Sequence, residues 1–187
     1  VVKNSQSIKS SRAKSRSAEI DFWLSFLRGA QSPDGNFGNP ANISSLIDTL
    51  AVAELFDSFG LKTDTNYQNA LKWLDKQYYE NTLSEAQKLL ALAENGQDVL
   101  YSLESVVMRQ NADGGGFGYS TKHESDPITT ATVLQAIDKS GYVDYGDKPD
   151  YAKIQALLFL VKAQNLDGGW GETNASTSDI RSTTQVL

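Results

Sequence analysis

The chain contains no cysteine, a single histidine and no long apolar run, and each absence removes a class of function. Without cysteine it can form no disulfide framework, no thiolate zinc site, no thiol nucleophile and no thioester. No apolar stretch approaches the roughly 18 residues that a membrane-spanning helix needs, so the sequence predicts no membrane span.

Metal-binding patterns are missing as well. Asp34, Asp113 and Asp167 lie in glycine-rich turns, but none has the Asp-x-Asp-x-Asp-Gly spacing that gathers enough oxygens for calcium. The one histidine, His123, lies in a polar loop, where an imidazole is usually solvated. We therefore expect no metal and no cofactor.

Charge is unevenly distributed along the chain. The first 17 residues carry five basic and no acidic side chains, and the remainder carries 12 basic (17 minus 5) and 23 acidic ones, or a net charge of −11. An acidic body argues against nucleic acid as a partner. We interpret residues 1–17 as a basic, serine-rich leader or linker. The acidic, cysteine-free composition favours a secreted or cell-surface protein, part of a larger exported bacterial protein.

One short phrase occurs three times, over residues 31–38, 110–118 and 164–171. Each copy reads glutamine, two variable residues, Asp-Gly, an aromatic residue and a final glycine. Asp-Gly ends a helix sharply, because aspartate bonds nearby backbone and glycine adopts positive φ. The glutamine amide can cap loose backbone groups, and the ring can pack back onto the helices. The predicted structural residues are Gln31, Asp34, Gly35 and Phe37; Gln110, Asp113, Gly114 and Phe117; and Gln164, Asp167, Gly168 and Trp170.

The flanking segments have the composition of helices. Apolar residues are dense over 18–27 and 151–161, before two of the copies, which predicts helices buried on more than one side. Segments 44–59, 129–137 and 178–187 follow the three copies and open with Ser, Thr or Asp. A glycine at 60 or 141 closes the first two of these later helices.

A fourth copy lacks only the Asp-Gly turn. Residues 70–77 match the first helix and its glutamine, and residues 83–96 match the second helix with its closing glycine. The sequence therefore predicts an all-α domain over 18–187 with eight helices in four antiparallel pairs. These pairs cover approximately 18–60, 64–96, 98–141 and 148–187.

The glutamine–aspartate–glycine–aromatic phrase, followed by a helix rich in Leu and Ala, resembles the repeat of squalene and oxidosqualene cyclases and protein prenyltransferase β subunits. The resemblance implies an α/α toroid of the terpenoid cyclase superfamily, in which this turn ties neighbouring pairs together. Four pairs imply a partial or incomplete barrel. Self-association or a neighbouring domain is then expected to cover the open flank.

The catalytic groups of that superfamily do not map onto this chain. The prenyltransferase zinc pattern places Asp126 at its aspartate, but Ile128 and Ser182 stand where cysteine and histidine are needed. The Asp-x-Asp-Asp acid of the hopene-type cyclases is also missing from the sequence. Asp126 and Asp179 are better explained as caps of helix N-termini.

We therefore predict a non-catalytic module that binds a small molecule or a protein. Its candidate surface is formed by the loops before the second helices. The candidate ligand-binding residues are Tyr119, His123, Asp126, Thr129, Asp179 and Arg181. The alternative is an isoprenoid-class transferase or cyclase whose catalytic residues lie outside this chain; an enzyme acting on polysaccharide is a third possibility, but it lacks a convincingly placed acid pair.

Overall fold

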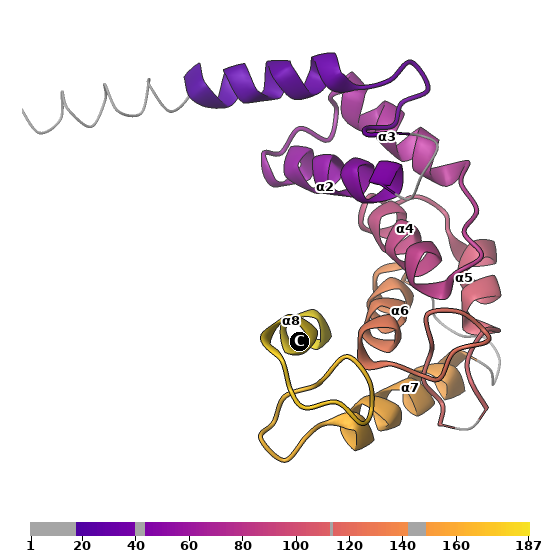
Figure 1. Cartoon of the computed structure of the whole chain (residues 1–187). Coiled ribbons are helices and arrows are strands. Elements are labelled where there is room, and N and C mark those ends of the chain that lie inside the picture. The colour runs from indigo at the N-terminus through magenta and orange to yellow at the C-terminus, as the bar shows by residue number, and fades with distance from the viewer. Residues whose placement is uncertain (1–17, 40–43, 113, 142–148) are drawn as a thin grey trace, which may run out of the picture. The chain divides into compact units, whose positions relative to one another are not determined.

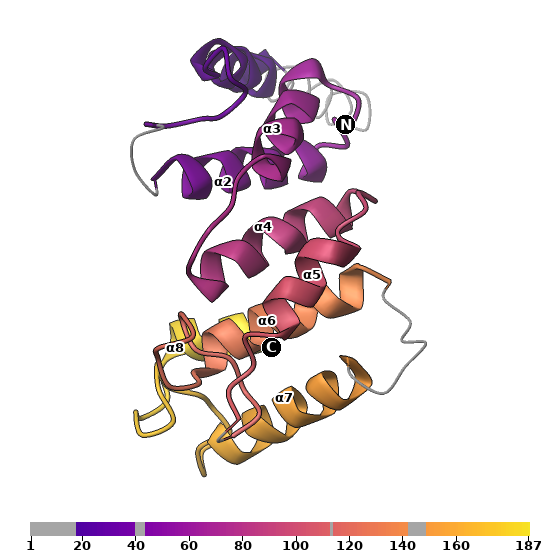
Figure 2. The same ribbon diagram turned by 90° about the vertical axis from the view of Figure 1, so that its right-hand side faces the viewer.

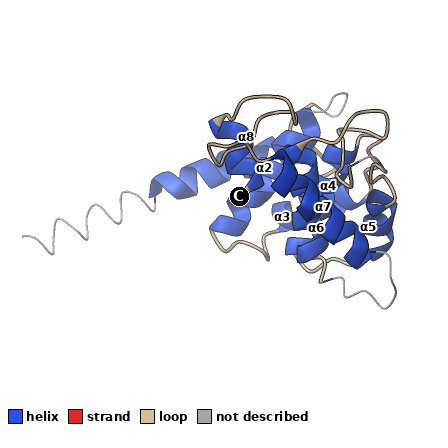
Figure 3. Ribbon diagram, turned by 90° about the horizontal axis from the view of Figure 1, so that it is seen from below, coloured by secondary structure: helices blue, strands red, loops and turns tan. Residues whose placement is uncertain are grey.

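The computed structural model describes residues 18–39, 44–112, 114–141 and 149–187. The predicted leader, residues 1–17, and Asp113 of the second turn lie outside the described residues. Within the described part every regular element is a helix, and no strand occurs (Figure 3). The all-α prediction is thereby confirmed for these residues.

The chain divides into two compact units, Val1–Trp73 and Leu74–Leu187. The described residues contain eight helices, as the repeat predicted (Figure 1). The first unit holds the helix 18–30, α2 (Ser44–Ser58) and most of α3 (Thr65–Asp75). The second unit holds the remaining helices, which are α4 (Thr82–Glu94), α5 (Leu100–Val107), α6 (Pro127–Lys139), α7 (Pro149–Ala163) and α8 (Ile180–Val186).

Helix α6 is the centre of the second unit. It packs against α4, α7 and α8, and Figure 2 shows α4 and α5 lying beside it. Val133 and Ile137 of α6 and Leu89 and Leu92 of α4 are all buried. Burial of such side chains contributes about 1.5–3 kcal/mol each relative to exposure, so this contact is a major source of the unit's stability.

The first unit has its own small core. Leu46 and Phe56 of α2 and Tyr67 of α3 are almost completely buried. Arg28 donates to the Asp64 carboxylate at 2.8 Å and lies over the Phe56 ring, 5.8 Å from its centroid. This arginine therefore joins the helix 18–30 to α2 and to the start of α3.

The three Asp-Gly turns follow helix ends, as predicted. The helix 18–30 ends directly before Gln31, and α7 ends directly before Gln164. The Gln31 amide donates to Gly35 O at 2.8 Å, within its own turn, and to Asn66 O at 2.7 Å, in the first turn of α3. One glutamine side chain thus satisfies carbonyls from two separate segments.

The second turn repeats this geometry. Gln110 Nε2 donates to Gly115 O at 2.6 Å and to Ala152 O, in the first turn of α7, at 2.7 Å. The prediction that Gly114 would adopt positive φ is wrong, because the left-handed residue here is Gly115, with φ of 75°. This turn has one extra glycine, which moves the left-handed position one residue further along the chain.

The aromatic residue of each turn is buried and fixed through its backbone. Phe117 N donates to Thr130 Oγ1 at 2.9 Å, and Thr130 Oγ1 donates back to Phe117 O at 3.2 Å. A buried hydroxyl therefore satisfies both backbone groups of the residue that carries the ring. The equivalent N–H···Oγ1 pairs are Phe37–Thr49 at 2.9 Å and Trp170–Thr183 at 3.0 Å.

An ion pair replaces this arrangement in the fourth copy, which lacks the turn. Glu85 and Lys88 of α4 are each 3% exposed, and Lys88 Nζ contacts Glu85 Oε1 at 2.5 Å. Lys88 also donates to Gln77 O at 2.8 Å, and Glu85 accepts from Tyr79 N at 3.0 Å. Burial, followed by the nearby Glu85 charge, raises the pKa of Tyr79 to about 12. The pair thus fixes the segment before α4 to that helix.

We predict that Thr130→Val costs about 1–3 kcal/mol of unfolding free energy, because the Phe117 N–H is left buried without an acceptor. Urea denaturation followed by circular dichroism measures this loss. Thr132→Val is the matched control, since the Thr132 hydroxyl bonds only Ile128 O of its own helix and its removal should change stability by about 0.5 kcal/mol or less. Equal losses in the two variants would contradict the assignment.

We predict that Lys88→Met lowers the unfolding free energy by about 3–5 kcal/mol at neutral pH, because it leaves the Glu85 carboxylate buried without a counter-charge. The double variant Glu85→Gln/Lys88→Met should recover most of the loss. Lys153→Met, which breaks the exposed pair of Lys153 with Asp138, should leave stability unchanged. A double variant as unstable as Lys88→Met would show that the charge is not the cause.

Candidate functional site

The loop before α6 carries an exposed pair of rings. Tyr119 and His123 meet edge to face, with centroids 5.7 Å apart and planes at 81°. Ser120 Oγ lies 2.7 Å from His123 Nδ1 and fixes the orientation of the imidazole. The loop thus presents a phenol, an imidazole and a hydroxyl side by side at the surface.

Backbone hydrogen bonds anchor this loop to its surroundings. Thr82 N, at the start of α4, donates to Tyr119 O at 2.7 Å. Asn111 Nδ2, in the second turn, donates to His123 O at 3.0 Å. Gly118 has no room for a side chain, because an added Cβ would meet the main-chain oxygens of His123 and Glu124. The exposed rings therefore stand on a fixed backbone.

Asp126 closes the loop and caps α6. Its carboxylate accepts from Thr129 N at 2.7 Å and from Thr129 Oγ1 at 2.8 Å. Desolvation by burial outweighs these hydrogen bonds and raises the pKa of Asp126 above its usual value. The capping role predicted from the sequence is confirmed.

Asp179 caps α8 with the same geometry in a different environment. It accepts from Ser182 N at 2.8 Å and from Ser182 Oγ at 2.7 Å. The carboxylate is exposed, so these hydrogen bonds, with a smaller contribution from the Arg181 charge, lower the pKa of Asp179. Two chemically identical caps thus have opposite pKa shifts because their burial differs.

The six predicted site residues form two groups in the second unit. Tyr119, His123, Asp126 and Thr129 lie in the loop before α6 and at the start of that helix. Asp179 and Arg181 belong to the start of α8, which packs against α6. Only the first group combines several different polar side chains and an aromatic ring.

Sequence reasoning missed the threonines that hold the turns. A signal for them exists, because Thr130 follows Phe117 by 13 residues and Thr183 follows Trp170 by the same interval. Glu85 occupies the corresponding position in α4, four residues after the cap Asn81, as Thr130 lies four after Asp126. Aligning the second helices on their caps would have revealed this position.

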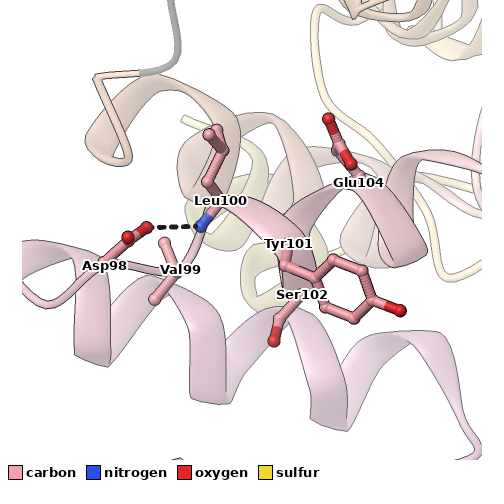
Figure 4. A pocket seen from close by; sticks show the side chains of 6 residues that line it. All are labelled: Asp98, Val99, Leu100, Tyr101, Ser102 and Glu104. Atoms are coloured by element: carbon pink, nitrogen blue, oxygen red, sulfur yellow. Dashed lines mark hydrogen bonds between the residues drawn. The ribbon is translucent and has the colours of Figure 1, made fainter.

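A separate surface depression of about 350 Å³ lies at the start of α5 (Figure 4). It is lined by one short segment, consisting of Asp98, Val99, Leu100, Tyr101, Ser102 and Glu104. Asp98 accepts from Leu100 N at 3.1 Å, and Figure 4 shows its carboxylate turned toward that nitrogen, apart from the Glu104 side chain. The Asp98 carboxylate therefore bonds the backbone at the start of its own helix.

Metal and membrane sites have no counterpart in the described residues. There, no three His, Asp or Glu side chains gather closely enough to hold a metal ion. None of the described helices is both long enough and apolar enough to cross a membrane.

No protein-family model matches this chain, and no curated protein is significantly similar to it in sequence. The resemblance to terpenoid cyclases and prenyltransferases therefore rests on the repeated turn and its flanking helices.

We predict opposite pH dependences for the two capping aspartates. Because the folded-state pKa of Asp126 is raised, the stability of the wild type relative to Asp126→Asn should be highest at acid pH and fall as pH rises through that pKa. The lowered pKa of Asp179 reverses the sign, so stability relative to Asp179→Asn should fall as pH drops. Urea denaturation across the acid range tests both, and parallel slopes would refute the prediction.

Proposed function

We propose that this chain is a non-catalytic binding module on an α/α-toroid scaffold of the prenyltransferase and squalene-cyclase type. The described residues contain eight helices, and three of the connections between them are glutamine-bearing turns. This arrangement supports four helix pairs in a partial barrel. The bonds of Gln31 to Asn66 and of Gln110 to Ala152 support it further, because each links the turn between the two helices of one pair to the first helix of the next pair.

The observation that carries the binding role is the exposed Tyr119–His123 pair on an anchored loop. Tyrosine offers a large contact area and a polar hydroxyl at a low cost in conformational entropy, and histidine adds a donor and an acceptor. Since Thr82 and Asn111 hold the loop backbone, little further ordering is needed when a partner binds.

The acids near this loop support binding rather than catalysis. Asp126 and Asp179 both use their carboxylates to cap helices, and each bonds one amide and one hydroxyl. A general acid or base must instead direct its carboxylate toward a substrate.

A peptide or protein surface is the partner that fits this loop best. Tyr119, Lys122, His123 and Glu124 are all exposed, so the loop offers an aromatic ring and charges of both signs. Such a mixture is typical of the rim and anchors of protein interfaces, whereas small molecules are usually enclosed in pockets. The acidic, cysteine-free composition suits an exported or cell-surface protein.

Selection from a random-peptide phage library on the immobilised protein tests this function. We expect enriched peptides to bind the wild type and to lose at least about tenfold in affinity for Tyr119→Ala and His123→Ala, as interface anchors do. Tyr101→Ala is the control, because Tyr101 is a tyrosine on α5 that is more exposed than Tyr119, at 87% against 45%.

Two results would overturn the proposal. Peptides that bind all variants equally would place the binding surface elsewhere. Saturable binding of farnesyl diphosphate, unaffected by the loop variants, would favour the isoprenoid-class alternative.

A further inference from the structure

The third Asp-Gly turn, residues 164–171, has an exposed surface. The equivalent surface of the other two turns is covered by another helix. Gly168 adopts φ of 87° and is exposed, whereas its counterparts Gly35 and Gly115 are buried. Gln164 is likewise exposed, whereas Gln31 and Gln110 are half-buried. The difference lies in what packs on each turn.

A helix start covers the first turn. Asn66 O accepts from Gln31 at 2.7 Å, and a Cβ added at Gly35 would lie only 2.5 Å from Asn69 O. Arg28 and Asp64 reinforce the junction with an ion pair of 2.8 Å. The turn and the first turn of α3 therefore form a close backbone contact, which the glycine permits.

The start of α7 covers the second turn with the same spacing. Ala152 O accepts from Gln110 at 2.7 Å, and a Cβ added at Gly115 would lie 2.7 Å from Gln155 Cβ. In both junctions the residue that covers the glycine lies three positions after the accepting carbonyl, 66 to 69 and 152 to 155. In each junction the glutamine and the glycine thus contact residues that lie one helical turn apart at the start of the covering helix.

The third turn has the same parts and no such helix among the described residues. Gln164 Nε2 donates to Gly168 O at 2.8 Å, as in the other copies, and no described atom lies within 4 Å of a Cβ added at Gly168. A groove of about 440 Å³ lies beside this glycine. It is lined by Asp167, Gly168, Gly169, Ser178, Asp179, Ile180, Thr183 and Thr184.

We propose that this groove binds the helix 18–30 of a second copy of the chain. That helix exposes a cluster of large aromatic side chains, with Phe22 at 72%, Trp23 at 58% and Phe26 at 71%. On the other side of the contact, Ile180 is 85% exposed at the edge of the groove. Association would remove both apolar surfaces from water.

The repeat gives the register of this contact. Asn66 lies 11 residues before the glutamine that ends its own segment, Gln77, and Ala152 lies 12 residues before Gln164. Counted back from Gln31, the accepting carbonyl is therefore that of Ile20 or Glu19. The residue that covers the glycine lies three positions after the accepting carbonyl, which is Trp23 if Ile20 accepts and Phe22 if Glu19 accepts. An aromatic residue therefore covers Gly168 in either register.

Charged side chains lie around both surfaces. Lys162, two residues before Gln164, is exposed, and so is Asp21 of the helix 18–30. The groove itself is lined by two carboxylates, those of Asp167 and Asp179, so the register depends on the apolar contact and on the turn geometry.

The contact joins two different surfaces of the chain. A heterologous contact of this kind repeats from copy to copy and yields either a closed ring or an open chain of subunits. The wild type should therefore form assemblies that grow with concentration. The proposal is independent of the binding role of Tyr119 and His123.

Sedimentation velocity on the full chain tests the association. We expect the wild type to associate reversibly below about 1 mM. The double variant Phe22→Lys/Trp23→Lys should weaken association at least about tenfold, because it places two charges in the groove. Tyr101→Lys is the control, because Tyr101 of α5 is an aromatic residue even more exposed than Phe22 and Trp23; this variant should associate like the wild type.

Cross-linking tests the register and uses the natural lack of cysteine. A mixture of Phe26→Cys and Ile180→Cys chains, treated with a short bis-maleimide, should give a mixed dimer in high yield. Met108, which is 87% exposed at the C-terminal cap of α5, supplies the control: Met108→Cys replaces Phe26→Cys in the control mixture and should give little mixed dimer. Equal yields of mixed dimer in the two mixtures would overturn the proposed contact. In sedimentation, a wild type that stays monomeric up to about 1 mM would overturn the association. The groove would then be left to a helix of another polypeptide.

Discussion

The bond from a turn glutamine to the first turn of a later helix is the interaction on which the repeat depends. Gln31 reaches Asn66 across 35 residues, and Gln110 reaches Ala152 across 42. A carbonyl that is buried without a donor costs about 1–3 kcal/mol, so each glutamine makes a close backbone contact possible that would otherwise be unfavourable. The left-handed glycine supplies the space, and the aromatic residue, held by a threonine, supplies the apolar contact.

The segment before α4 shows that other chemistry can perform the same task. It has no Asp-Gly turn, and a carboxylate and an ammonium group replace the threonine hydroxyl at the buried position. A hydroxyl satisfies two backbone groups at little desolvation cost. A buried ion pair satisfies them at a higher cost, so its stability depends on both partners being present.

The candidate site illustrates how a repeated scaffold and a variable loop divide their roles. Asp126 and Asp179 perform the same capping task, and burial is the main reason why the pKa of Asp126 is raised while that of Asp179 is lowered. Between the second turn and the Asp126 cap, the chain places Tyr119 and His123 on a fixed backbone with their side chains exposed. The proposed recognition surface therefore consists of side chains that the repeat does not use.

Sequence alone predicted the helices, the turn positions, the closing glycines and the two aspartate caps, because all of these depend on interactions between residues close in the chain. Gly60 and Gly141 do adopt positive φ after α2 and α6, and the cap bonds span three residues. The choice of Gly114 was wrong because the extra glycine of that turn offers two positions with equal local preference.

The tertiary structure decided everything that involves distant partners. Glu85 and Lys88 look like an ordinary surface pair at helical spacing, and only packing of α4 against α6 and α5 shows that they are buried. The contact of Tyr119 with His123 and the carbonyls that accept from each glutamine could not be predicted for the same reason. Copies of the same sequence phrase also gave covered and exposed turns, as Gly35 and Gly168 show. The local sequence determines backbone conformation, but burial depends on which other segment reaches the turn.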